Sequence, residues 1–264
     1  MYCFFVEIFG GNMIDTHAHL TKQDYTTIEL KNVINKMGDN IIVVAATNKD
    51  DSLEVIDLIN KYDNIYGVIG IHPTEINKNS SLEFILKYIN HSKIIGIGEV
   101  GLDYHYDCDK EMQKHIFIEQ IKLANKYHKT LVIHTRDATK DVYDILKKYK
   151  DKNTKAIIHC YSSSLEMAQE FIKLNCKLGI GGVLTFKNSK TLKEVVKNID
   201  LKYLLLETDS PYLTPEPFRG KKNEPYNIIY VAEKIAQIKN ISLEEVLNVT
   251  TRNAICQFDL DVKL

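Results

Sequence analysis

The sequence predicts an α/β fold, a single-domain (β/α)8 TIM barrel, from three observations. Short β-branched runs alternate with longer amphipathic runs, which is the pattern of a parallel sheet with crossover helices. Eight such strand runs occur, and no linker or low-complexity stretch separates them. The length of 264 residues lies in the range of one such barrel. A doubly wound open sheet is the structural alternative.

The expected strands are rich in Val, Ile and Leu because parallel strands are covered on both faces. In chain order they span residues 13–17, 40–47, 65–73, 93–103, 130–137, 155–162, 176–186 and 203–211. The expected helices carry apolar residues three and four positions apart. They include residues 52–62, 81–89, 110–127, 141–149 and 165–174, with two more, 226–239 and 242–258, after the eighth strand.

The barrel domain is expected to span residues 13–264. Residues 1–12, "MYCFFVEIFGGN", are apolar and then glycine-rich. They lack the basic start and the small-residue cleavage site of a secretory signal peptide. We therefore expect an N-terminal extension, or a true start at Met13.

Composition excludes several classes of protein. The chain is 44% hydrophobic and 26% charged, and it has no apolar run long enough to cross a membrane. A net charge of -1 excludes a strong global basic field, so a nucleic acid would have to meet a local patch. The five cysteines are scattered without a CxxC pair, which favours a reducing compartment, the cytoplasm first and the nucleus second. No obligate protein partner is evident.

Residues that bind metals or protons gather at the carboxyl ends of the expected strands, where barrel active sites lie. They are Asp15, His17 and His19 on the first strand, His72 on the third, Glu99 and Asp103 on the fourth, His134 and Arg136 on the fifth, His159 on the sixth, and Glu207 and Asp209 on the eighth. Five of the nine histidines are thus expected on one face. Imidazoles and carboxylates around one cavity suit zinc, manganese or magnesium ions.

The pair His17 and His19 is the clearest local signal, because alternate residues of an extended chain point to the same side. Each candidate alone also has an ordinary structural explanation, such as a core histidine, a helix cap or a turn residue. Their joint occurrence at the ends of several strands favours a site for one or two ions. We expect Glu99 to bridge two ions, and Asp209 to bind one ion and to orient or deprotonate the attacking water.

A basic loop follows the eighth strand, "TPEPFRGKKNEP", with Arg219, Lys221 and Lys222. Guanidinium and ammonium groups match phosphate oxygens, so the loop is a candidate phosphate-binding loop, with a solvated surface loop as the alternative. The expected substrate-binding residues are His72, Arg136, Arg219 and Lys221. Four aromatic residues near strand ends can stack on bases or simply pack: Tyr104, Tyr161, Tyr212 and Phe218.

The motifs resemble those of a known family, the TatD-type metal-dependent deoxyribonucleases, within the amidohydrolase-like superfamily of TIM barrels. In order they read "DTHAHL", "GIHP", "GEVGLDY", "LVIHTRDA", "IHCYSSS", "GGVLTFKN", "LLLETDSPYL" and "PFRGKKNEP", and they cover nearly the whole chain from Met13. Two places depart from the family pattern. One is Ser162 to Ser164, a segment in which the family usually has a glycine, and the other is Thr74 and Glu75 after "GIHP".

The resemblance implies two divalent metal ions, Mg²⁺ or Mn²⁺ for activity, with Zn²⁺ as an alternative. It implies a first ion held by His17, His19, Glu99 and Asp209, and a second held by Glu99, His134 and His159. It further implies hydrolysis of DNA phosphodiester bonds, with 3′–5′ exonuclease trimming of single-stranded or frayed ends in DNA catabolism or repair. Glu99 and Asp209 are the expected catalytic residues.

Three other functions remain open at this point. One is a small-molecule amidohydrolase, although many of those carry a modified lysine at the end of the fourth strand, where this chain has Glu99. Another is a D-aminoacyl-tRNA deacylase on the same metal site, and the last is a scaffold or nucleic-acid-binding module without turnover. The basic loop favours a phosphate substrate. Because the net charge is near zero, we expect a shallow salt dependence of DNA affinity.

Overall fold

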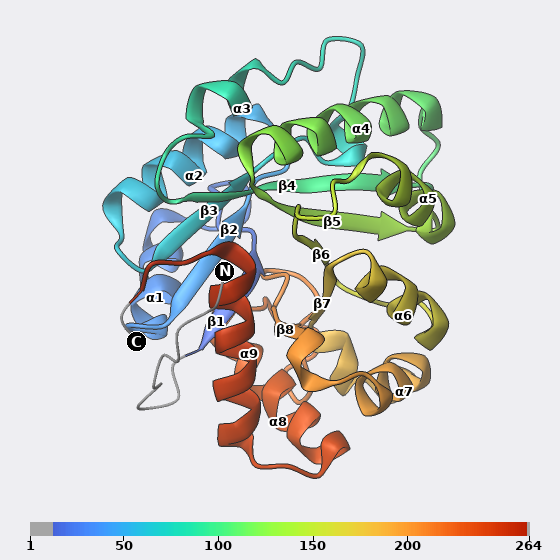
Figure 1. Ribbon diagram of the computed structural model, residues 1–264. Helices are drawn as coiled ribbons and strands as arrows, with labels where there is room; N and C mark the ends of the chain where they lie inside the picture. The colour runs from blue at the N-terminus through green and yellow to red at the C-terminus, as the bar shows by residue number, and fades with distance from the viewer. Residues whose placement is uncertain (1–12, 263–264) are drawn as a thin grey trace.

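Eight parallel strands follow one another around a nearly closed barrel in the order of the chain (Figure 1). The computed structural model describes residues 13–262, so the predicted extension, residues 1–12, lies outside the described residues. The strands are β1 (Ile14–Ala18), β2 (Ile41–Ala45), β3 (Ile65–Ile69), β4 (Ile94–Asp103), β5 (Thr130–Arg136), β6 (Ala156–Ile158), β7 (Cys176–Ile180) and β8 (Leu204–Leu206). The TIM-barrel prediction is confirmed, and this strand order excludes the doubly wound sheet.

The barrel closes where the chain after β8 meets the end of β1. Ala18 forms a parallel bridge with Ser210, and the His19 N–H donates to the Ser210 carbonyl at 2.7 Å. The Asp209 N–H donates to the His17 carbonyl at 2.9 Å. Main-chain pairing therefore joins the two segments, far apart in sequence, that carry the first and the last of the predicted metal ligands.

The helices lie around the outside of the strands (Figure 1). They are α1 (Thr27–Met37), α2 (Lys49–Lys61), α3 (Glu83–Tyr88), α4 (Lys110–Tyr127), α5 (Thr139–Tyr149), α6 (Leu165–Lys173), α7 (Lys190–Asn198), α8 (Ile228–Lys239) and α9 (Leu243–Phe258). Short 3₁₀ turns are η1 (Pro73–Glu75), η2 (Gly182–Thr185), η3 (Leu201–Tyr203) and η4 (Pro225–Asn227). Helices α1 and α7 add to those named from the sequence. The Thr26–Glu29 capping box that begins α1 satisfies free N–H groups at that end.

The prediction that the seventh strand continues to residue 186 is wrong, because β7 ends at Ile180 and the η2 turn follows. The Leu184 N–H donates to the Gly181 carbonyl, which closes the turn. A side chain at Gly182 would lie 2.1 Å from the Leu213 carbonyl, so the chain here packs backbone to backbone against the loop after β8. The apolar run that suggested a longer strand is thus a turn at the mouth of the barrel.

Two apolar clusters hold the barrel together. The larger fills the layer between the strands and the surrounding helices. The smaller fills the inside of the barrel with residues such as Val43, Val68 and Leu205, and it continues to Ile255 and Phe258 of α9. Each fully buried side chain of this kind contributes about 1.5–3 kcal/mol. Helix α9 therefore covers the amino end of the barrel and leaves the carboxyl end open.

Among residues 13–262, no helix is both long and apolar enough to cross a bilayer.

Candidate metal centre

The carboxyl end of the barrel holds a pocket of about 880 Å³, and most of the predicted histidines and carboxylates line it: His19, His72, Glu99, Asp103, His134, His159 and Asp209. His17 and His19 come from the end of β1, Glu99 from β4, His134 from β5, His159 from the residue after β6, and Asp209 from the loop after β8. His72 enters from the loop after β3. Parallel strands bring their carboxyl ends to one rim, which explains why residues so far apart in sequence meet here.

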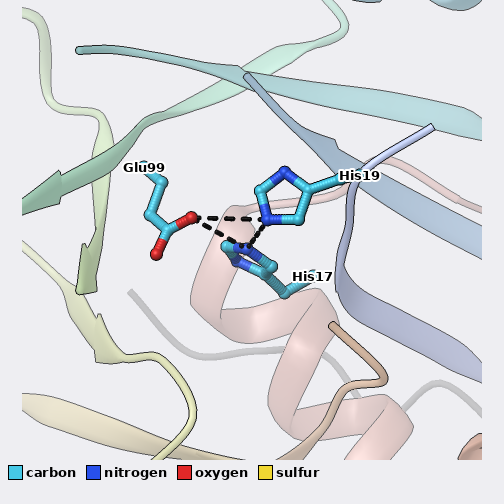
Figure 2. A group of neighbouring side chains, drawn as sticks. All are labelled: His17, His19 and Glu99. Atoms are coloured by element: carbon cyan, nitrogen blue, oxygen red, sulfur yellow. Dashed lines mark hydrogen bonds and ion pairs between the residues drawn. The ribbon is translucent and has the colours of Figure 1, made fainter. Parts of the chain in front are cut away.

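His17, His19 and Glu99 form the tightest group (Figure 2). The Nε2 atoms of the two histidines lie 3.1 Å apart, and Glu99 Oε2 lies 3.3 Å from the first and 3.4 Å from the second. All three side chains are nine-tenths buried or more. Two rings on alternate residues of β1 thus point to one place, as the sequence predicted.

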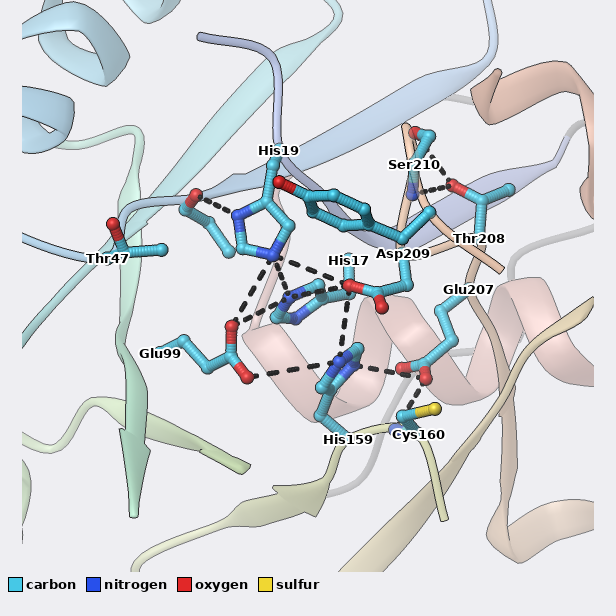
Figure 3. A network of polar contacts seen from close by, with 12 residues as sticks. His17, His19, Thr47, Glu99, His159, Cys160, Glu207, Thr208, Asp209 and Ser210 are labelled. Carbon is cyan, nitrogen blue, oxygen red and sulfur yellow. Dashed lines mark hydrogen bonds and ion pairs between the residues drawn. The ribbon is translucent and has the colours of Figure 1, made fainter. Parts of the chain in front are cut away.

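Asp209 and His159 lie on the other side of His17 (Figure 3). Asp209 Oδ1 is 3.4 Å from His19 Nε2, 3.4 Å from His159 Nε2 and 3.8 Å from His17 Nε2. The rings of His17 and His159 stack with centroids 3.5 Å apart. Asp209 has a left-handed backbone with φ of 57°, a conformation that Asp tolerates better than most residues and that often occurs at functional sites.

The second oxygen of Glu99 faces another pair of histidines. Glu99 Oε1 lies 2.8 Å from His134 Nδ1 and 3.6 Å from His72 Nε2, and the two rings are 4.4 Å apart. The other nitrogen of His134 contacts Asp103 Oδ2 at 3.1 Å. Glu99 is therefore the carboxylate common to two sets of imidazoles.

A main-chain carbonyl and a carboxylate lie behind two of the rings. The Nδ1–H of His19 donates to the Ala45 carbonyl at 3.0 Å, which turns its Nε2 toward the pocket. Glu207 Oε1 lies 3.1 Å from His159 Nδ1 and accepts the Cys160 N–H at 2.6 Å. Sequence reasoning placed Glu207 at the end of its strand but gave it no role. The sequence feature that could have indicated a role for Glu207 is its position two residues before Asp209, after the same apolar run.

Asp15 is a second buried carboxylate with a supporting role. It accepts the N–H groups of His17 and Thr208, at 3.2 and 2.9 Å, and also the Thr208 hydroxyl. Burial raises the pKa of Asp15 well above its usual range. This residue ties β1 to the chain after β8 beside the histidine cluster and is absent from the pocket lining, so its role is structural.

The donor set fits a divalent ion. Two ligands bound to a tetrahedral zinc at about 2.1 Å lie about 3.4 Å apart, which is close to the spacing of the His17, His19 and Glu99 atoms. Within residues 13–262, four groups of three His, Cys, Asp or Glu residues have ligand atoms within 4.8 Å of one another, and three of these groups belong to this cluster. The buried Nδ1 of His17 has no hydrogen-bond partner among the described residues.

The carboxylates shift the protonation of the cluster strongly. Burial alone would lower the pKa of His19, yet its hydrogen bonds to Asp209 and Glu99 outweigh burial and raise it to about 10. The same balance, with Asp103 and Glu99 as partners, raises the pKa of His134 to about 9. Burial lowers the pKa of His72 to about 4. Despite burial, the surrounding imidazoles hold the pKa of Glu99 well below its usual range, so the floor favours positive charge beside its carboxylates.

The predicted substrate-binding residues divide into two sets. His72 and Arg136 line the pocket. Arg219 and Lys221 are absent from the lining; the first lies over the Phe186 ring and the second over the Phe218 ring. A role for the basic loop thus stays a prediction, and it would concern contacts outside the pocket.

The predicted aromatic residues also divide. Tyr161 is buried, the Tyr104 hydroxyl donates to Asp141, and Phe218 packs against Tyr230. Tyr212 is half exposed and lines the pocket. Ser162, Thr74 and Glu75, which depart from the family pattern, line it too.

The fold and the site define a TIM barrel with a cluster of histidines and carboxylates at its mouth that could hold metal ions. The chain belongs to the TatD related DNase family, whose model matches residues 14–259. It is thus a metal-dependent hydrolase acting on ester bonds.

Relatives and solved structures agree over almost the whole chain. It is 44% identical to the uncharacterized metal-dependent hydrolase YabD of Bacillus subtilis, over 92% of this chain and 97% of that protein. It is 32% identical to the uncharacterized metal-dependent hydrolase YcfH of Escherichia coli, over 94% of this chain and 96% of that protein. The crystal structure of YJJV, a TatD homolog from Escherichia coli, superposes with a TM-score of 0.86 at 28% identity, over 94% of this chain and 98% of that one.

Proposed function

We propose that the protein is a deoxyribonuclease that hydrolyses phosphodiester bonds at single-stranded or frayed DNA ends, trimming from the 3′ end with two divalent metal ions. The observation that carries the proposal is the position of Glu99. One of its oxygens faces His17 and His19, while the other faces His134. A carboxylate shared in this way suits two neighbouring ions better than one, and paired ions are common in enzymes that cleave phosphodiesters.

The proposed ligands are the six residues expected from the sequence. His17, His19, Glu99 and Asp209 would hold the first ion, and Glu99, His134 and His159 the second. His159 Nε2 lies 3.4 Å from Asp209 Oδ1 and 3.9 Å from Glu99 Oε1, so it reaches both sides. When bound, such ions polarise the phosphoryl group and bring the pKa of a coordinated water near neutrality.

Residues of the chain itself would complete the reaction. Asp209 Oδ1 faces the cluster and the open pocket, where it can orient a water and accept its proton. Arg136 lines the same pocket and can pair with a phosphate oxygen. Because the cluster lies at the floor of a pocket, a free single-stranded end can reach it, whereas the flank of a duplex is held at the rim.

The test uses a single-stranded oligonucleotide labelled at its 5′ end, incubated with the protein and Mn²⁺ or Mg²⁺. We expect a ladder that shortens from the 3′ end and that disappears with EDTA or in the Asp209→Asn variant. A circular single strand of the same composition is the matched control, and an exonuclease leaves it intact. An intact linear oligonucleotide, despite full binding of metal, would contradict the proposal and favour hydrolysis of a small amide or of an aminoacyl-tRNA ester.

A further inference from the structure

Charge is distributed unevenly around the mouth of the pocket. Among the described residues that line it, Arg136 is the single lysine or arginine. The lining carboxylates are Asp24, Asp51, Glu75, Glu99, Asp103 and Asp209. The last three lie at the floor with the histidines, and the first three follow β1, β2 and β3 at the rim.

The three rim carboxylates, which we call the acidic rim, are held in place by neighbouring side chains. Asp51 Oδ2 accepts the Thr47 hydroxyl, and Asp24 Oδ1 accepts the Tyr212 hydroxyl at 3.3 Å. Glu75 Oε2 accepts an amide hydrogen of Asn48 at 3.5 Å. At physiological salt, repulsion between charges is effective up to about 8 Å. A phosphate that passes within this distance of the acidic rim would be repelled by its carboxylates.

The next sector, formed by the loop after β4 and the end of β5, carries the single cation of the described lining, Arg136, beside an exposed aromatic ring. Tyr106 is 55% exposed, and the guanidinium carbon of Arg136 lies 5.5 Å from the centre of its ring. The His105 ring meets Tyr106 edge-on at 5.1 Å, and His105 Nδ1 contacts Asp137 Oδ2 at 3.4 Å. An aromatic ring and a planar cation thus form one surface that bridges the loop after β4 and the end of β5.

This surface begins close to the proposed metal ligands. Asp103 pairs in register with Arg136 across β4 and β5, and the Tyr104 N–H donates to the Arg136 carbonyl at 2.9 Å. Asp103 also contacts His134, which contacts Glu99. A nucleotide next to the scissile phosphate could therefore reach Tyr106 without leaving the pocket.

We propose that the bound DNA strand leaves the pocket over Tyr106 and Arg136, away from the acidic rim. Tyr106 stacks on the base next to the scissile phosphate, and Arg136 pairs with a phosphate of the retained strand. This inference rests on the proposed deoxyribonuclease function and names the residues that set the path of its substrate. The aromatic–guanidinium surface accepts any base, because every base has a face that can stack.

The test compares KM on two single-stranded oligonucleotides that differ only in an abasic residue next to the scissile phosphate on the retained side. Tyr106→Ala should raise KM for the natural strand by about 5- to 150-fold, the range of one lost stacking contact. The same change should leave KM for the abasic strand within about twofold of the wild-type value. It should change kcat little, because Tyr106 does not touch the reacting atoms. Tyr106→Phe keeps the ring and should behave like the wild type.

A second measurement uses the salt dependence of binding, followed by fluorescence anisotropy of the same natural strand. A plot of log affinity against log salt concentration has a negative slope. Arg136→Gln should make this slope shallower by about 0.7, the value for one phosphate contact on a single strand. Lys140→Gln, on the exposed face of α5, removes the same charge outside the pocket and should leave the slope unchanged.

The outcomes separate the two proposals. If the wild type trims DNA but Tyr106→Ala raises KM equally on both strands, or not at all, the path over Tyr106 is wrong while the nuclease function stands. An Arg136→Gln slope equal to that of the wild type also overturns the path. If the wild type neither trims nor binds the strand, the proposed function fails and the inference falls with it.

Discussion

The histidines on the two sides of Glu99 differ in how deeply they are buried. On one side lie His17, His19, His159 and Asp209, which we call the buried group; its histidine side chains are at most 9% exposed, and the side chain of Asp209 is 16% exposed. On the other side lie His72 and His134, the open group, with side chains 13% and 20% exposed. Glu99 thus joins three deeply buried histidines to two that are more exposed.

The two groups also differ in what holds their rings. In the buried group, the Ala45 carbonyl accepts the Nδ1–H of His19, Glu207 Oε1 lies 3.1 Å from His159 Nδ1, and His17 Nδ1 has no hydrogen-bond partner among the described residues. In the open group, Asp103 contacts His134, while His72 Nδ1 pairs with the exposed Thr74 hydroxyl at 2.7 Å. Deeply buried side chains have little freedom left to lose when they bind an ion, so we expect the first ion, held by His17, His19, Glu99 and Asp209, to bind more tightly than the second. The open group then exchanges ligands with water and substrate.

The largest effect is expected where the two groups meet. Glu99→Gln should lower kcat/KM for DNA by roughly 10³-fold or more, because the change removes charge from both groups at once. Steady-state kinetics measure it, with Glu119→Gln on the outer side of α4, paired with Lys122, as the matched control. A loss smaller than that of the Asp209→Asn variant would contradict a bridging role for Glu99.

Metal binding should stabilise the fold, chiefly through the buried group. At a Mn²⁺ concentration of 100 Kd, one site adds about 2.7 kcal/mol to the free energy of unfolding. Thermal unfolding of wild type, Asp209→Asn and His134→Ala measures this shift. Asp209→Asn should lose the stabilisation seen at low Mn²⁺, whereas His134→Ala should keep it and lose only the part seen at higher concentration. The reverse order would show that the open group binds first.

Glu207 sharpens the comparison because it acts through His159 rather than on substrate. Glu207→Gln should weaken metal affinity by about 10- to 100-fold, the usual cost of removing a carboxylate behind a ligating histidine. Saturating metal should restore most of kcat, which a residue in contact with substrate would not allow. Gly179→Ala should mimic the effect, since a Cβ there would lie 2.0 Å from Glu207 Oε2 and displace the carboxylate. Isothermal titration calorimetry with Mn²⁺ measures the metal affinity of both variants.

The smallest effect is expected in the open group. Asp103→Asn removes one of the two carboxylates that face His134, and the ring keeps its contact with Glu99. We expect metal affinity of the weaker site to fall by about tenfold, at the low end of the range for an outer partner. A larger loss than that of Glu207→Gln would mean that the open group, rather than the buried one, depends on its supporting carboxylate.

The sequence by itself predicted the barrel and most of the candidate floor. Eight hydrophobic runs of strand length, six of them ending in His, Asp or Glu, specify both a parallel sheet and the edge where those residues gather, since all the carboxyl ends of a barrel share one rim. His17, His19, Glu99, His134, His159 and Asp209 could be named in this way, and the structure brings them together. Their role as ligands remains a proposal.

Only the tertiary structure decided which residues meet within that rim. Glu207 lies behind His159 because Gly179 of β7 leaves room for its carboxylate, and no local pattern reports a contact between strands. Tyr106, in the loop after β4, reaches Arg136 at the end of β5, whereas Arg219, named from its charge, lies over Phe186 outside the pocket. Strand ends follow from periodicity along the chain. Side-chain partners follow from register and barrel closure, which depend on segments far apart in sequence.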